Sequence, residues 1–410
     1  MLDFRSVLFV CFLGTLVACG GGGGGGAAPT PPPPPPPPLS VGPDICTNGS
    51  AGDFPCSGIT LRKRVSIEAM DGTGGNDIWG WFDTQSGNEY ALMGMENGTA
   101  FVDVTNPEDP VFLGRLPSET ADSISRDIKV YQDHAYIVVD NAGAHGMQVF
   151  DLTRLRGLVG PQTFAPDLVY RDFEEAHNIA INEDTGFAYA VGSETCEGGL
   201  HIIDIRTPNN PLFAGCHPVD PRTHDTQCVI YQGPDADDAN REVCVSSNID
   251  FVEIVDVTDK SAPVTISTVT YPQVAIAHQG WLTEDHRFFL LGDEGDEFRF
   301  NVPTRTYVFD VSDLDAPQYV FAYEAVTTTT DHNLYVLGNR VFQANNASGL
   351  RVLEFGDLAN QELTEIAFLV TYPDNRPGRI QGAWSVYPYL PSGTIIVSDG
   401  TNGLFVLSMQ

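Results

Sequence analysis

Four of the nine histidines recur at similar intervals along the chain, and each is followed by an amide or an acidic residue. Three further polar pairs continue the same series toward the two ends. The seven pairs are Asn76-Asp77, Arg126-Asp127, His177-Asn178, His224-Asp225, His278-Gln279, His332-Asn333 and Gln381-Gly382. Neutral imidazole is a common ligand of transition metals, and carboxylates bind both transition metals and Ca²⁺. The recurrence therefore indicates a divalent-cation site, provided that the fold brings these positions together.

The candidate metal or ligand residues are four imidazoles and two neighbouring carboxylates. They are His177, His224, His278, His332, Asp127 and Asp225, and Ca²⁺, Zn²⁺ or Mn²⁺ is the candidate cofactor. A structural role is nevertheless the first interpretation and cation binding the second, because an imidazole beside Asn or Asp can bond to the backbone of a neighbouring repeat, and repetition would copy that bond. Catalysis is a third interpretation. The chain has no Gly-x-Ser-x-Gly, His-Glu-x-x-His, Walker or dinucleotide motif, so we assign no catalytic residue.

A second recurrence indicates which elements position these pairs. After each pair comes a short apolar run that ends in an acidic residue and a hydroxyl, typical of a buried strand whose end is turned by Asp and Ser/Thr side chains. The copies begin at Phe101, Val149, Ile202, Ile254 and Val308, with weaker ones at Val352 and Phe405. Seven copies at nearly constant spacing predict a repeat fold.

Each repeat contains four predicted strands; those of the third are at 177–181, 187–191, 200–205 and 212–216. The last repeat stops after its third strand, whereas residues 58–68 form a lone strand ahead of the first repeat. We therefore predict an all-β, seven-bladed propeller over residues 58–410, whose last blade is closed by the N-terminal strand so that no sheet edge stays exposed. A β-sandwich is the alternative, which the succession of repeats along the chain disfavours.

In a propeller the inner strands surround a channel, so the seven polar pairs should form a ring at one mouth. The loops between second and third strands open on the same face. One of them, Asp293-Glu-Gly-Asp-Glu297, lacks the spacing of a known calcium loop. We predict a solvated acidic loop there, with Ca²⁺ binding as the alternative. The four tryptophans, Trp79, Trp81, Trp281 and Trp384, are predicted to pack in the core, with a carbohydrate or peptide platform as the alternative.

The N-terminus has the pattern of an exported lipoprotein. Residues 1–18 read as a signal peptide whose apolar run is too short to span a membrane, and Leu16-Val-Ala-Cys19 resembles a lipobox in which Cys19 is lipidated. Residues 19–40 continue as a tether of glycines and then eight prolines, which cannot build a core. We expect this anchor to attach the protein to the outer membrane or cell surface, facing the periplasm or the exterior.

Six cysteines follow Cys19, consistent with an oxidising compartment. Cys46 and Cys56 bracket a small segment, 41–57, ahead of the propeller. The predicted blade geometry favours the pairs Cys46–Cys56, Cys196–Cys216 and Cys228–Cys244. A reduced Cys196 acting as a nucleophile is the alternative.

The net charge is −33, and the N-terminal forty residues contribute nothing to it. Such a surface excludes nucleic acid as a partner and attracts cations or basic molecules, although acidity also serves simply to keep an exported protein soluble. We expect a monomer whose partners are membrane lipid at the anchor and a protein, peptide or glycan ligand.

The chain resembles the choice-of-anchor B family, which is built on LVIVD repeats. The resemblance rests on the repeated strand, of which Ile254-Val-Asp-Val257 is the best copy, and on the His-Asn/Asp pairs; it covers about residues 58–410. Repeats six and seven depart from it, with Glu354 and Leu407 in place of Asp. The resemblance implies an exported propeller that is attached to the surface, and it implies no established reaction.

The leading hypothesis from the sequence is therefore a surface-anchored binding scaffold. The alternative is a metal-dependent extracytoplasmic enzyme, a hydrolase or oxidoreductase, that uses the same ring of histidines.

Overall fold

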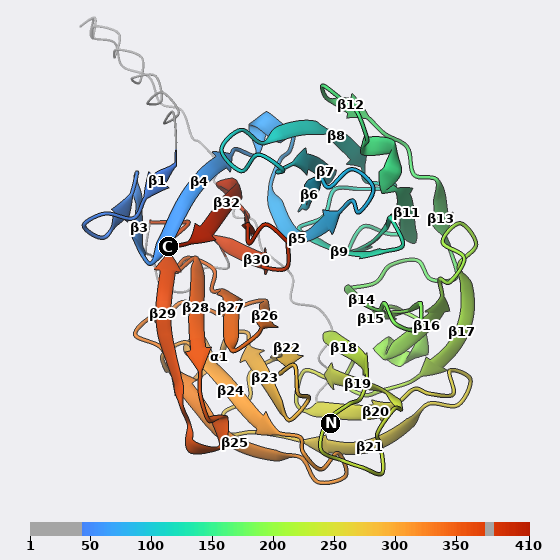
Figure 1. The fold of residues 1–410 in the computed structure, drawn as a ribbon. Helices are drawn as coiled ribbons and strands as arrows, with labels where there is room; N and C mark the ends of the chain where they lie inside the picture. The colour runs from blue at the N-terminus through green and yellow to red at the C-terminus, as the bar shows by residue number, and fades with distance from the viewer. Residues whose placement is uncertain (1–42, 374–380) are drawn as a thin grey trace, which may run out of the picture. The chain divides into compact units, whose positions relative to one another are not determined.

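The residues that the computed structural model describes, 43–373 and 381–410, form seven β-sheets that succeed one another around a central axis (Figure 1). Every blade is built on four antiparallel strands, as predicted. The predicted signal peptide, Cys19 and the predicted tether lie outside the described residues. No helix within the described ranges is long and apolar enough to cross a membrane.

The first four blades follow the chain order from the axis outward. Blade one contains β5 (Gly75–Phe82), β6 (Glu89–Met95), β7 (Gly98–Asp103) and β8 (Val111–Pro117), with the short parallel β12 (Gln162–Thr163) at its outer edge; blade two contains β9 (Ser125–Tyr131), β10 (His134–Asp140), β11 (Met147–Asp151) and β13 (Leu168–Tyr170); blade three contains β14 (Asn178–Asn182), β15 (Phe187–Val191), β16 (Leu200–Asp204) and β17 (Leu212–His217); blade four contains β18 (Asp225–Ile230), β19 (Glu242–Ser247), β20 (Val252–Asp256) and β21 (Val264–Val269).

The last three blades complete the ring. Blade five contains β22 (Ala277–Leu282), β23 (Phe288–Asp293), β24 (Arg305–Asp310) and β25 (Gln318–Glu324); blade six contains β26 (Leu334–Leu337), β27 (Arg340–Ala344), β28 (Leu350–Phe355) and β29 (Leu363–Leu369); blade seven contains β30 (Ala383–Tyr387), β31 (Ile395–Asp399), β32 (Gly403–Met409) and β4 (Ile59–Val65). The helical pieces are η1 (Glu68–Met70), η2 (Leu152–Leu155), η3 (Cys196–Gly198), α1 (Asp296–Phe300) and η4 (Leu358–Asn360).

The ring closes where the two ends of the propeller meet. Strand β4 pairs antiparallel with β32, from Leu404 opposite Val65 to Met409 opposite Ile59, and the two strands lie side by side in Figure 1. The amide of Gln410 also donates to the carbonyl of Gly58 at 2.9 Å. The predicted closure of the last blade by the N-terminal strand is therefore confirmed.

The segment bracketed by Cys46 and Cys56 adds to the outer edges of two blades. Strand β1 (Asp44–Ile45) pairs with β4 in blade seven, whereas β3 (Phe54–Ser57) pairs with β29 in blade six and β2 (Ser50–Ala51) with β3. The segment thus joins the closing blade to its neighbour on the outside of the ring.

The recurring strand is the third strand of each blade, and its acidic residue turns the chain as predicted. In five blades the carboxylate accepts a hydrogen bond from the backbone amide two residues later, at 2.9 to 3.0 Å. The acceptors are Asp103, Asp151, Asp204, Asp256 and Asp310. These bonds satisfy backbone amides that no longer pair with a neighbouring strand after the third strand ends. The repeated motif, an Asp at the end of the strand, is therefore structural.

The three predicted disulfides are present: Cys46–Cys56, Cys196–Cys216 and Cys228–Cys244. Cys228 and Cys244 lie directly opposite each other on β18 and β19. Because Cys196 is bonded to Cys216, the alternative of a reduced nucleophile at Cys196 is wrong.

Candidate functional site

Four histidines form a continuous arc at one mouth of the channel. The ring centroids of His177 and His224 are 4.2 Å apart, those of His224 and His278 4.1 Å, and those of His278 and His332 4.3 Å. The recurrence in the sequence therefore corresponds to direct contact in space.

β-bulges redirect two of the side chains that face the channel, those of His278 and Trp384. Between β22 and β23 the pairing moves from Ala277 directly to Gln279, so His278 is bulged; Trp384 is bulged in the same way between β30 and β31. A bulge bends the strand and redirects its side chain.

In blade seven, the pair equivalent to the His-Asn and His-Gln pairs of the other blades is Trp384-Ser385. The prediction that this pair is Gln381-Gly382 was wrong. His332 Nδ1 lies 2.7 Å from the carbonyl oxygen of Trp384, and the Asn333 amide donates to Ser385 Oγ at 3.3 Å. These bonds repeat those of His224 with His278 and of Asn178 with the following blade. In blade seven, Trp384 stands at the position that a histidine occupies in blades three to six. A pattern of polar pairs does not include a tryptophan.

The two imidazole nitrogens of these residues have different surroundings. His224 Nδ1 lies 3.1 Å from the carbonyl oxygen of His278, and His177 Nδ1 lies 2.8 Å from Asp140 Oδ2. Blade-to-blade bonding of this kind is what the structural alternative requires. It is also the orientation that metal-binding histidines use, because a bond at one nitrogen fixes the ring and directs the other at the ion.

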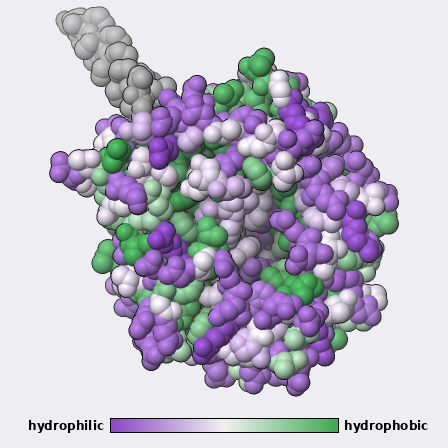
Figure 2. Space-filling view, viewed as in Figure 1, coloured by the Kyte–Doolittle hydropathy of each residue, from purple (hydrophilic) through white to green (hydrophobic). Residues whose placement is uncertain are grey.

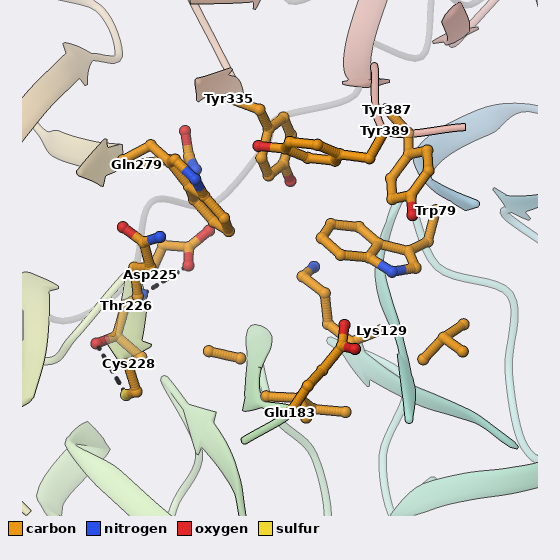
Figure 3. Close-up of a pocket in the computed structure, with 15 residues that line it drawn as sticks. Trp79, Lys129, Glu183, Asp225, Thr226, Cys228, Gln279, Tyr335, Tyr387 and Tyr389 are labelled. Atoms are coloured by element: carbon orange, nitrogen blue, oxygen red, sulfur yellow. Dashed lines mark hydrogen bonds between the residues drawn. The ribbon is translucent and has the colours of Figure 1, made fainter. Parts of the chain in front are cut away.

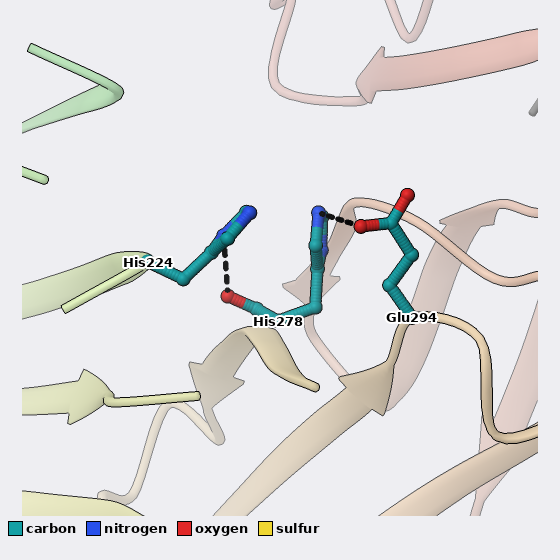
Figure 4. Close-up of side chains that lie close together, drawn as sticks. All are labelled: His224, His278 and Glu294. Atoms are coloured by element: carbon teal, nitrogen blue, oxygen red, sulfur yellow. Dashed lines mark hydrogen bonds and ion pairs between the residues drawn. The ribbon is translucent and has the colours of Figure 1, made fainter. Parts of the chain in front are cut away.

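His224, His278 and Glu294 form a group whose ligand atoms lie within 4.8 Å of one another. Figure 4 shows the two rings and the carboxylate directed into one space, and Glu294 Oε2 is 3.8 Å from His278 Nε2. Two imidazoles and one carboxylate form a donor set that suits Zn²⁺ and other transition metals. The site thus can hold a divalent ion without rearranging the backbone.

The electrostatics of the group favour a bound cation. Burial holds the pKa values of His224 and His278 well below the usual range, and neighbouring imidazoles lower them further. Both rings are therefore neutral at neutral pH, as ligation requires. Burial, and then the charge of Asp293, raises the pKa of Glu294 to about 7, so a bound cation would favour its ionised form.

A cavity of about 720 Å³ opens in front of the arc. All four histidines line it, together with Glu294, Arg222, Asp140 and Trp384. Arg222 lies 3.8 Å from Asp140 Oδ2 and its side chain is 44% exposed, so a guanidinium also faces this space. The cavity can take a ligand larger than a metal ion.

Asp127 and Asp225 do not join the group around Glu294. Asp127 accepts a hydrogen bond from Lys129 Nζ at 2.6 Å and another from the amide of Ile179 at 2.7 Å. Asp77 lies 4.0 Å from the same ammonium. The structure thus places these carboxyl groups in a buried layer beneath the histidines.

Lys129 favours the ionised form of one carboxyl group in this buried layer over the others. Burial opposes the ionisation of Asp127, but the Lys129 ammonium outweighs it and lowers the pKa of Asp127. Burial, and then the charge of Asp127, raises the pKa of Asp77 well above its usual range and that of Asp225 to about 7. One cation therefore balances one ionised carboxylate, and the remaining groups retain protons near neutrality.

A second cavity, of about 280 Å³, lies along the later residues of the inner strands. Figure 3 shows Trp79, Tyr335, Tyr387 and Tyr389 around it, with Lys129 and Glu183 at its wall. Trp281 lines it as well. Trp79 and Trp81 are buried in the core as predicted, and Trp281 packs against it; Trp81 stacks on Tyr90 at 4.8 Å between ring centroids. Trp79 and Trp281 also line this cavity, and Trp384 lines the cavity in front of the histidines.

The predicted solvated acidic loop is buried, so that prediction was wrong. Asp293 and Asp296 are 0% exposed and Glu297 is 5% exposed. Asp293 is the last residue of β23, where it accepts bonds from Tyr271 and from two backbone amides, and Asp296 accepts from Tyr307 at 2.8 Å. Glu294 belongs to this loop; the sequence suggested it only as part of an alternative Ca²⁺ loop and not as a partner of His224 and His278. Its position immediately after a second strand was the available signal.

Comparison with known proteins supports the fold alone. No family model and no curated protein matches this chain. The β-propeller domain of Cps50 (Swd1) from Myceliophteria thermophila is 11% identical, with a TM-score of 0.51 over 82% of this chain and 98% of that domain. A proposed 6-phosphogluconolactonase from Bacteroides uniformis is 13% identical, with a TM-score of 0.51 over 70% of this chain and 84% of the other. The protein is a seven-bladed β-propeller, and function has to be argued from its sites.

Proposed function

We propose that this protein is an exported, surface-anchored binding scaffold that holds a divalent metal at one mouth of its channel. The ligands are His224, His278 and Glu294. The observation that carries the proposal is that their ligand atoms lie within 4.8 Å of one another beside a cavity of about 720 Å³. A metal with three protein ligands keeps open positions for a ligand in the cavity.

The donor set favours Zn²⁺ or Mn²⁺ over Ca²⁺. Calcium takes six to eight oxygen ligands, whereas imidazole suits transition metals. In this site two of the three donors are imidazole nitrogens. Among the candidate cofactors, Zn²⁺ therefore ranks first, Mn²⁺ second and Ca²⁺ last.

The ligand in the cavity is a protein, peptide or glycan segment that carries a metal-binding group. Arg222 and Trp384 line the same cavity as the three metal ligands. A guanidinium can pair with a carboxylate of the ligand, and an indole can stack on a ring or a sugar face. The outer surface is largely hydrophilic around the central hollow in the view of Figure 2, and the net charge of −33 disfavours nucleic acid.

Thermal unfolding with added metal tests the proposal. Zn²⁺ at 100 times its dissociation constant should stabilise the wild-type protein by about 2.7 kcal/mol, because only the folded state binds it. His278→Ala should remove this effect. His134→Ala is the matched control, because His134 bonds the carbonyl of Gln132 outside the site. An equal Zn²⁺ effect in wild type and His278→Ala would contradict the metal site.

Surface attachment is the second part of the proposal, and it rests on Cys19 and the tether. The three disulfides support an oxidising location. The resemblance to the choice-of-anchor B family supports attachment as well. Replacement of Cys19 by Ala should move the protein from the membrane fraction to the soluble extract, and retention in the membrane fraction would contradict lipid anchoring.

A metal-dependent hydrolase is the second candidate function. It is favoured by the open coordination positions beside His177 and Arg222, because catalytic zinc sites keep such a position for water or substrate. Hydrolysis of nitrophenyl esters or phosphates that is lost in Glu294→Gln and on chelation would support it. The absence of turnover in the zinc-loaded protein would leave the binding scaffold as the function.

A further inference from the structure

The second cavity is a box of aromatic rings. Its rings come from blades one, five, six and seven, so strands far apart in the sequence build it together. Trp79 contacts Tyr387 at 5.0 Å with planes 62° apart and Tyr335 at 5.7 Å with planes 73° apart. Trp281 contacts Tyr335 at 4.9 Å with planes 67° apart. Rings at such angles present faces and edges from several sides to one enclosed space (Figure 3).

Several polar groups of this wall have partners within the protein. Gln279 accepts from the amide of Leu334 and donates to the carbonyl of Gly280. Asp225 accepts from the amide of Thr226, and Tyr389 donates to the carbonyl of Val336. These groups are engaged, so aromatic faces and edges supply much of the contact surface that the cavity offers a ligand.

The charge around the cavity favours a cation. The Lys129 ammonium is paired with Asp127 at 2.6 Å and lies near Asp77, so its charge is balanced from behind. Glu183 lines the cavity and can supply a negative charge there, whereas Asp225, which also lines it, belongs to the buried layer whose remaining groups retain protons. Glu183 takes part in none of the ion pairs found among the described residues. Lys129 Nζ also lies 4.6 Å from the ring centroid of Trp79, which demonstrates that a ring face of this wall accepts an ammonium group.

We propose that this cavity binds a compact organic cation, an alkylated ammonium of the choline type. Aromatic boxes recognise such cations through the negative faces of their rings and do not require hydrogen bonds. A cavity of about 280 Å³ is large enough for a trimethylammonium group. This site lies on the other side of the buried Asp127–Lys129 layer from the histidine arc, and it does not depend on the proposed metal.

Calorimetric titration of the full chain in the presence of chelator tests the proposal without metal. The probes are choline, its neutral isostere 3,3-dimethyl-1-butanol, and D-glucose. We expect choline to bind at least about tenfold more tightly than the isostere, because a desolvated cation–π contact is worth 2 kcal/mol or more. Equal affinity for the alcohol, binding of glucose alone, or no heat with choline would each overturn the proposal.

Two tryptophan variants locate the site. Trp281→Leu removes a wall of the aromatic cavity and should weaken choline binding about tenfold. Trp384→Leu is the matched control in the histidine cavity and should leave choline binding unchanged. Unchanged binding in Trp281→Leu would overturn the assignment. If Trp281→Leu fails to fold, Glu183→Gln replaces it, because loss of this rim charge should also weaken choline binding, and an unchanged affinity would contradict the proposal.

Discussion

At the scale of single residues, the two nitrogens of His224 have different partners. His224 Nδ1 bonds the next blade, while Nε2 faces the cavity near His177 Nε2 at 2.8 Å. The structural interpretation and the metal interpretation of the histidines are therefore compatible. The sequence could place the histidines on one ring but could not indicate which partner each nitrogen would meet.

Lys129 is the residue on which the buried layer depends. Replacement by Met would leave Asp127 and Asp77 without their cation, and removal of one partner of a buried pair costs about 3–5 kcal/mol. Urea unfolding at pH 7 should show this loss in Lys129→Met. Lys63→Met, on the partly exposed strand β4, is the control and should change stability by less than about 0.5 kcal/mol. An equally small effect at both positions would contradict the account of the layer.

At the scale of elements, periodicity predicted the strands well, but it could not predict bulges or buried loops. The third strands recur because their alternating apolar residues fill the space between blades, as Phe101 and Phe150 do at 4.7 Å. His278 and Trp384 point into the channel because of bulges, which no residue pattern announces. The loop after β23 is rich in carboxylates and seemed suited to solvent, yet the tyrosines of blades four and five bury it.

That buried loop predicts a dependence of stability on pH. Burial, and then the charge of Asp296, raises the pKa of Glu297 to about 8. The folded protein therefore binds this proton more tightly than the unfolded chain, whose Glu pKa is about 4.3. Stability from this group is present at low pH and is lost as the pH rises toward 8.

Urea unfolding at pH 6.5 and pH 8.5, in wild type and in Glu297→Gln, separates this effect from those of other buried carboxyl groups. The buried histidines act in the opposite direction, but only below pH 6.5, since burial lowers the pKa of His332 to about 4. The free energy of unfolding should fall across this window in wild type and should fall less in Glu297→Gln. Glu108→Gln, at an exposed position, should behave as wild type. Identical slopes in wild type and Glu297→Gln would show that Glu297 does not titrate in this range.

At the scale of the whole molecule, closure of the ring depends on blade seven. The sequence made closure predictable because the last repeat lacked a strand and the N-terminal region had a spare one. Strand β4 supplies it, and Arg62 Nε donates to Ser408 Oγ at 3.0 Å across the seam. What the repeats could not predict was that residues 44–57 would reinforce the same seam from outside.

Deletion of residues 59–65 should destabilise the whole propeller in one cooperative step, because it opens the edges of β32 and ends the continuity of the ring. Differential scanning calorimetry would record this as a large fall in Tm with a single transition. The Cys46→Ser, Cys56→Ser double variant is the comparison; it keeps β4 and should lose only about 2–4 kcal/mol. A deletion variant that melts like wild type would refute the shared blade.

The metal content of the protein tests the central claim most directly. Elemental analysis of the purified full chain should find about one zinc or manganese ion per molecule, removable by chelator and restored on dialysis against the metal. The His224→Ala, His278→Ala double variant should fold but contain none, because it lacks two of the three ligands. A wild-type protein that takes up no metal, or a double variant that holds as much metal as wild type, would contradict the account.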